Sequence, residues 1–174
     1  MTRPAKKKIH KKLLNCLFVL YIIFLLKVVL FKGPLSMITE TFRNWQLPSF
    51  DQAFNIIPLF TIGGYLRAIA SGGMNTSIII DNLVGNILLF VPWGFLLPLI
   101  FKKSKSLRQV LLAGMIFVLC IEAMQFVTRL GSFDIDDLIL NLVGVLIGYG
   151  IFRAALAIQR SCCSKRPSFK RAKS

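Results

Sequence analysis

The sequence is poor in residues that often carry catalysis or bind metal ions. It has one histidine, His10, in a basic leader, and only seven acidic residues in 174. It contains no Ser-His-Asp set, no phosphate-binding glycine loop and no CxxC pair. The single histidine lies outside the regions that carry the carboxylates, so a zinc site is not expected. The sequence indicates no particular cofactor and leaves open whether the protein catalyses a reaction.

Cysteine is also scarce, and the four cysteines do not form a disulfide framework. Cys16 and Cys120 lie within apolar runs, whereas Cys162 and Cys163 are adjacent in a basic tail. We expect this tail to be cytoplasmic, where thiols stay reduced. The simple interpretation is small, incidental side chains, and palmitoylation of the adjacent pair is the alternative.

Apolar residues, in contrast, are abundant and occur in long runs. The hydrophobic content is 55%, which is typical of an integral membrane protein. The net charge of +15 would also suit a nucleic-acid-binding protein. Basic residues, however, cluster between and beyond the apolar runs, which favours a membrane topology over nucleic acid as a partner.

The apolar runs predict one transmembrane domain, residues 13–158, between a basic leader (1–12) and a basic tail (159–174). The expected fold class is all-α, a polytopic bundle of four transmembrane helices with a short interfacial or re-entrant segment after the first. That segment, residues 56–66, is too short to span and contains one proline and two glycines. The four spans are expected at about 13–31, 78–101, 109–128 and 138–158.

The distribution of charge predicts the orientation of the bundle. Seventeen of the 22 basic residues lie in the leader, in the loop 102–108, or at Arg153 and in the tail. The acidic residues lie on the opposite side or in the adjoining halves of spans. Positive charge favours the cytoplasm, so we expect a multi-pass protein of the cell membrane with both termini cytoplasmic. The turn 129–137 then faces outward.

Polar residues of the third and fourth spans gather near this turn. Glu122, Gln125 and Arg129 share one helical face. Glu122 is interpreted either as a pocket residue or as one half of a buried pair with Arg129 or another basic residue, because a carboxylate at this depth is costly without a partner or a wet cavity. A proton acceptor, a metal ligand or a head-group contact are the open roles for a pocket residue.

The start of the fourth span carries the acidic residues Asp134, Asp136 and Asp137. Carboxylates at a helix start cap free N–H groups, which would explain one or two of the three. A hard cation is the alternative, but no ligand spacing rule is met and no metal is predicted. Asn141 lies on the same face as Asp137 and is expected to point into the bundle.

The second span carries two asparagines near its start and two prolines farther along. Asn82 and Asn86, one turn apart, are interpreted either as cross-links between helices or as part of the same pocket. Pro92 and Pro98 are expected to bend this span. Small residues on the second and fourth spans are assigned to close helix packing; these are Gly85, Gly94, Gly144 and Gly148.

Together these pieces resemble the VanZ-like family of small bacterial membrane proteins. The resemblance covers roughly residues 55–150, and departures are Cys120, where the family often has serine, and Leu59, which interrupts a Pro-Phe pair. The family is named for resistance to the glycopeptide teicoplanin. The matching pieces are Asn55 to Phe60, Asn82 to Asn86, Phe90 to Phe95 with Pro98, Ile121-Glu122 with Gln125 and Arg129, and Asp134 to Asp137 with Asn141, Gly144 and Gly148.

The leading hypothesis is a cell-envelope protein whose outward polar pocket binds an amphiphilic envelope lipid or a lipoglycopeptide while the bilayer surrounds its helices. The resemblance implies a link to antibiotic resistance or envelope homeostasis. The alternatives are a membrane enzyme acting on a lipid-linked envelope substrate and a small proton-coupled exporter. Candidate pocket residues are Asn82, Asn86, Glu122, Gln125, Arg129, Asp134, Asp136, Asp137 and Asn141.

Overall fold

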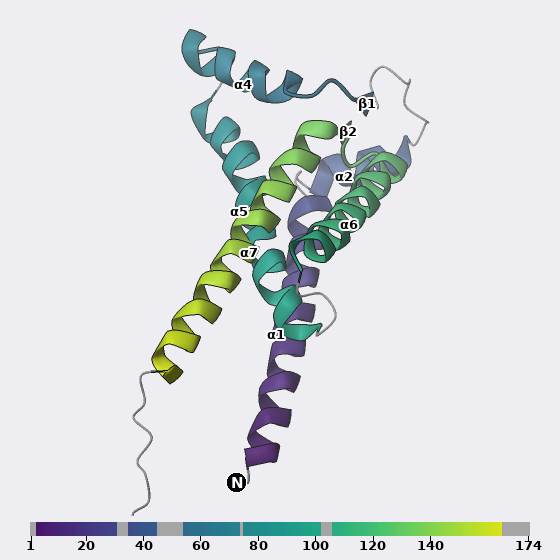
Figure 1. Cartoon of the computed structure of the whole chain (residues 1–174). Helices are drawn as coiled ribbons and strands as arrows, with labels where there is room; N and C mark the ends of the chain where they lie inside the picture. The colour runs from purple at the N-terminus through teal and green to yellow at the C-terminus, as the bar shows by residue number, and fades with distance from the viewer. Residues whose placement is uncertain (1–2, 31–34, 45–53, 74, 102–105, 165–174) are drawn as a thin grey trace, which may run out of the picture.

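Helices dominate the chain, and four of them are long and apolar enough to cross a membrane (Figure 1). The computed structural model describes residues 3–30, 35–44, 54–73, 75–101 and 106–164. The predicted all-α, four-span membrane bundle is therefore confirmed. The long helices are α1 (Arg3–Leu30), α5 (Thr76–Ile100), α6 (Leu107–Thr128) and α7 (Ile135–Ser164).

Side-chain caps set where two of these helices begin. Asn75 accepts a hydrogen bond from the N–H of Ser77 at 3.0 Å, and α5 starts at once. Ser106 and Gln109 form a reciprocal capping box at the start of α6, with bonds of 3.3 and 3.4 Å. The first N–H groups of a helix have no partner within it, so such caps are stabilising. The helices consequently begin a few residues before the apolar runs do.

Short elements connect the long ones. They are α2 (Leu35–Arg43), β1 (Phe54–Asn55), α4 (Phe60–Ser71) and β2 (Phe133–Asp134). The two strands pair in parallel, with Asn55 opposite Asp134. With twelve residues α4 is too short to span, none of its residues is buried, and it lies across one end of the bundle (Figure 1). Its exposed Phe60, Leu66 and Ile69 suit a position at the membrane interface.

The two ends of the bundle differ in what they carry. α1 begins and α7 ends at one end, here called the terminal end, and β1, β2 and α4 lie at the other, the strand end (Figure 1). An even number of spans requires this arrangement. The polar residues of the third and fourth spans are thereby brought to the strand end.

Backbone contact between α5 and α7 forms the tightest packing in the bundle. A Cβ added to Gly94 would lie 2.0 Å from the carbonyl oxygen of Val145, and one added to Gly148 would lie 2.0 Å from that of Val91. At Gly144 the nearest carbonyl oxygen, that of Ile87, would be 2.1 Å away. No side chain fits at these three positions, here called the glycine seam, so the helices approach as closely as their backbones permit.

Gly85 does not belong to this seam, although the sequence grouped it with the other three. A Cβ added there would meet no described atom within 4 Å. Its side of α5 turns away from α7 and borders an open groove. A glycine in an apolar helix can mark either a contact or a free face, and spacing alone does not distinguish the two.

Aromatic residues fill the core beside the seam. Trp93 of α5 stacks on Phe117 of α6 with ring centroids 4.4 Å apart, and Phe18 of α1 lies 5.8 Å from Trp93. α5 continues through Pro92 and Pro98 as one helix. Close to Pro92, which removes a backbone donor from the helical ladder, Tyr21 donates its hydroxyl hydrogen to the carbonyl of Leu89 at 2.7 Å.

The glycine seam can be tested by its effect on the stability of the protein. Gly144→Ala should destabilise the purified protein by about 1–3 kcal/mol, because the added methyl group would force the α5 and α7 backbones apart. Gly150→Ala is the matched control, since Gly150 is exposed in α7 with open space around it. The control should unfold at the wild-type temperature or above it, because alanine favours the helix. Equal thermal unfolding of the two variants in detergent would contradict the seam.

Candidate functional site

Asp136 of α7 is fully buried and holds the start of α4. One carboxylate oxygen accepts the N–H of Leu59 at 2.6 Å, and the other accepts the N–H of Ile62 at 3.0 Å. Leu59 is the N-cap of α4, and its apolar side chain makes no cap. These two N–H groups are the pair that a capping box would satisfy. Asp136 thus supplies from another helix the cap that α4 lacks.

The backbone at this point is strained as well as uncapped. Leu59 has φ 64° and ψ 9°, a left-handed conformation that costs about 1 kcal/mol or more outside glycine. Hydrogen bonds to a carboxylate stabilise by about 1.5–3 kcal/mol, and the positive end of the α4 dipole adds to this. The carboxylate therefore offsets the strain of the turn that enters α4.

Asp134 joins three elements at the same place. Its Oδ1 accepts from the N–H of Asp136 at 2.9 Å, which caps α7, and from Nδ2 of Asn55 in β1 at 3.3 Å. Its Oδ2 accepts from the hydroxyl of Thr61 in α4 at 2.7 Å. Asn55 also donates to Thr61 at 2.6 Å. The strand pair is therefore held by side chains as much as by its two-residue ladder.

The buried polar residues of α6 hold the neighbouring segments. Glu122, 2% exposed, accepts the backbone N–H of Asp134 at 3.2 Å. Gln125, also buried, donates to the carbonyl of Val29 in α1 at 3.2 Å. Arg129 does not continue their face, because it is the C-cap of α6 with φ 58°. Helical spacing ceases to apply once the backbone enters the left-handed region.

Asn86 connects α5 to the same assembly. Its amide donates to Asp137 at 2.6 Å, across the α5–α7 contact. Asn141, one turn farther along α7, is buried, and its carbonyl oxygen has no hydrogen-bond partner in the part of the chain that the structure describes. We call the bonded group the strand-end network. It consists of Asn55, Thr61, Asn86, Glu122, Asp134, Asp136 and Asp137.

The carboxylates of the network act on a neighbouring phenol. Burial raises the pKa of Tyr65, and the carboxylates of Asp137 and Asp134 raise it further. Tyr65, on α4, is therefore neutral at physiological pH. Across the described ranges, no group of three His, Cys, Asp or Glu residues is arranged to hold a metal ion. The oxygens of Asp134 and Asp136 instead accept hydrogen bonds from N–H and O–H donors.

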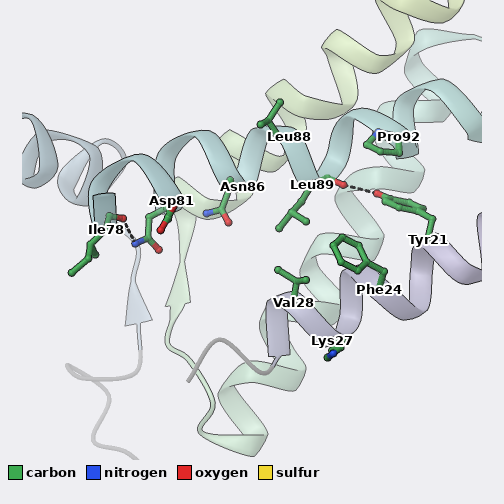
Figure 2. A pocket seen from close by; sticks show the side chains of 12 residues that line it. Tyr21, Phe24, Lys27, Val28, Ile78, Asp81, Asn86, Leu88, Leu89 and Pro92 are labelled. Atoms are coloured by element: carbon green, nitrogen blue, oxygen red, sulfur yellow. Dashed lines mark hydrogen bonds between the residues drawn. The ribbon is translucent and has the colours of Figure 1, made fainter. Parts of the chain in front are cut away.

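A groove of about 850 Å³ separates the ends of α1 and α5 nearest the network (Figure 2). We call it the α1–α5 groove. Figure 2 shows Phe24 and Val28 of α1 facing Leu89 of α5 across it. The residues that line it are Tyr21, Phe24, Lys27, Val28, Ile78, Asp81, Asn82, Gly85, Asn86, Leu88, Leu89 and Pro92.

The groove is polar at its strand end and apolar deeper in. Lys27 lies on the last turn of α1, and Asp81 and Asn82 lie near the start of α5. Lys27 and Asp81 are exposed and of opposite charge. Asn82 donates to the carbonyl of Ile78 in its own helix at 2.7 Å. The arrangement offers a charged entrance followed by an apolar wall.

Two of the nine residues singled out from the sequence, Asn82 and Asn86, line this groove. Asn86 belongs to both groove and network, so it connects them. Four others join Asn86 in the network: Glu122, Asp134, Asp136 and Asp137. The remaining three, Gln125, Arg129 and Asn141, lie outside both.

Several residues of the site have no signal in the sequence. Thr61 and Asn55 reach Asp134 across more than 70 positions, and Tyr21 reaches Leu89 across 68. Thr61 and Tyr21 have no such signal, whereas Asn55 opens the Asn55–Phe60 piece of the resemblance. The charges of Lys27 and Asp81 are apparent in the sequence, but not that both residues line one groove.

A family model described as VanZ/LLP1 matches residues 18–157. The chain belongs to the VanZ/LLP1 family. It is also similar to "Protein VanZ" of Enterococcus faecium, with 29% identity over 136 residues, which cover 78% of this chain and 71% of that protein. No solved structure matches. The resemblance drawn from the sequence is confirmed, and the VanZ/LLP1 match includes every residue of the groove and the network.

The cap supplied by Asp136 can be tested by Asp136→Asn. Asparagine keeps the size but offers one oxygen and places an NH₂ group against an N–H, so about 1.5–3 kcal/mol of local stability should be lost. Amide hydrogen exchange at Leu59 and Ile62 should accelerate by roughly tenfold or more. Asp81→Asn, at an exposed position of α5, is the control. Unchanged exchange at both amides would show that the carboxylate does not hold α4.

Proposed function

We propose that this VanZ/LLP1-family protein binds an amphiphilic envelope molecule in the α1–α5 groove at the outer leaflet. In doing so it would lower susceptibility to lipoglycopeptides of the teicoplanin type or maintain the envelope. The observation that carries the proposal is the polarity of the groove, which is charged at its strand end and apolar deeper in. An amphiphile likewise has a polar head group at one end and an apolar tail.

The orientation of the bundle is part of the proposal. In the sequence, basic residues gather in the leader, the loop 102–108 and the tail, which adjoin the helix ends that lie at the terminal end. Positive charge favours the cytoplasmic side, so the strand end faces outward and both termini are cytoplasmic. The groove entrance then lies at the depth of the outer head groups.

The head group, rather than the tail, would decide which molecule binds. A tail that leaves lipid for an apolar groove gains little, because the two environments are equally apolar. Lys27 and Asp81, in contrast, offer one cation and one anion at the entrance, and Asn82 adds an amide. A head group with both anionic and cationic or hydrogen-bonding groups would be selected.

The strand-end network would support this site from behind. Asp137 fixes the amide of Asn86, which lines the groove. Asp134 and Asp136 hold β1 and α4 against α7 at the same end. The contacts favour neither of the other hypotheses, a membrane enzyme or a proton-coupled exporter.

Gly85 offers a test that fills the groove without disturbing the fold. Gly85→Leu places a side chain into open space on the groove side of α5. We expect wild-type protein to raise the minimum inhibitory concentration of a teicoplanin-type lipoglycopeptide several-fold in a susceptible host, and Gly85→Leu to abolish this gain. A glycopeptide without an acyl chain should be unaffected.

The matched control is Gly150→Leu, which adds the same side chain to an exposed glycine with open space in α7. It should protect as wild type does, at equal membrane expression. Full protection by Gly85→Leu would exclude the groove as the binding site. Absence of protection by the wild type would exclude the resistance function.

A further inference from the structure

A second cavity lies at the terminal end, on the other side of the bundle from the network. It has a volume of about 500 Å³ and lies between the end of α5 and the far part of α7. Pro98 and Leu99 line it from α5, and Arg153, Leu156 and Arg160 line it from α7. None of these residues takes part in the groove or the network.

The cavity exists because the glycine seam stops short of it. Gly94, the one seam glycine on α5, packs against Val145 and Tyr149 of α7. Beyond this point α7 presents the buried Phe152 rather than a glycine, and α5 ends at Ile100. The two helices diverge there in Figure 1, with α7 continuing past the end of α5. The space between them is open to the surface of the bundle, because Leu99, Arg153 and Ala157 are exposed.

Two guanidinium groups border this space, and none of the described carboxylates lines it. Arg153 and Arg160 are seven residues apart on α7 and share a face. Arg153 donates to the hydroxyl of Tyr149, one turn earlier in α7, at 3.4 Å. The acidic residues of the described chain all lie toward the strand end; they are Glu40, Asp81, Glu122, Asp134, Asp136 and Asp137.

We propose that this cavity binds the phosphate of an anionic glycerophospholipid, with an acyl chain lying on Leu99, Leu156 and Ala157. Arginine pairs with phosphate through parallel N–H···O bonds, and basic cavities between spans at the cytoplasmic surface bind acidic head groups. The site lies at the opposite end from the groove, so it stands whether or not the groove binds an amphiphile; it shares only the proposed orientation.

The depth of the two arginines fits a phosphate layer. Arg153 is eighteen residues after the start of α7, or about 27 Å along the helix axis, close to the limit of a hydrocarbon core of about 30 Å. Arg160 lies about 10 Å farther along. The pair therefore brackets the depth at which lipid phosphates lie, and the apolar wall favours a lipid over free phosphate.

The test is lipid binding by the full-length protein in detergent, followed by native mass spectrometry and by thermal unfolding. Phosphatidylglycerol should remain bound and raise the unfolding temperature, whereas phosphatidylcholine and inorganic phosphate should not. Arg153→Gln with Arg160→Gln should weaken phosphatidylglycerol binding by about tenfold or more. Arg108→Gln, which removes a basic residue of α6 outside this cavity, should leave it unchanged.

A second variant keeps both arginines. Ala157→Trp fills the cavity at an exposed position and should also weaken binding of phosphatidylglycerol. If Arg108→Gln weakened phosphatidylglycerol binding equally, the binding would depend on general surface charge rather than on this cavity, and the proposal would be overturned. Stabilisation by inorganic phosphate to the same extent would show a site for a free anion, and equal retention of phosphatidylcholine would show no recognition of charge.

Discussion

The bundle depends on the backbone contact between α5 and α7. Three glycines, Gly94, Gly144 and Gly148, permit an approach that any side chain would prevent. This contact fixes the register of the two helices and so places Asn86 opposite Asp137. It also fixes where the helices part, which leaves the cavity at the terminal end. Within a bilayer, where apolar burial drives little helix association, such close packing is a principal source of specificity.

A second constraint acts at the strand end, where the chain leaves the regular helices. The turn into α4 places Leu59 in a left-handed conformation with no cap of its own. Asp136, which lies on α7, accepts hydrogen bonds from the two free N–H groups at the start of α4. Asp134 accepts further hydrogen bonds from Asn55 and Thr61. Asp134, Asp136 and Asp137 accept hydrogen bonds within this network. Their clustering follows from two helix starts meeting at one point.

The sequence predicts those features whose physical cause is local. Run length and charge identify the four spans, and the composition at helix starts indicates caps such as Asp134, whose partner is two residues away. The partners of Asp136 are 74 and 77 positions distant, and no pattern in either segment points to the other. Arg129 leaves the face of Glu122 because the helix ends at it. Gly85 borders a groove because α1 and α5 are separated at this end. These outcomes depend on tertiary packing, which spacing within one segment does not encode.

The proposed function requires that the α1–α5 groove admit the tail of an amphiphile from the outer leaflet. A photoreactive group on the acyl chain of a lipoglycopeptide, activated in membranes that contain the protein, tests it most directly. Peptide mapping should place the adducts on Phe24, Val28 and Leu88, which line the groove. Adducts spread equally over Leu112, Ile116 and Leu119, exposed apolar residues of α6 that do not line it, would contradict the account.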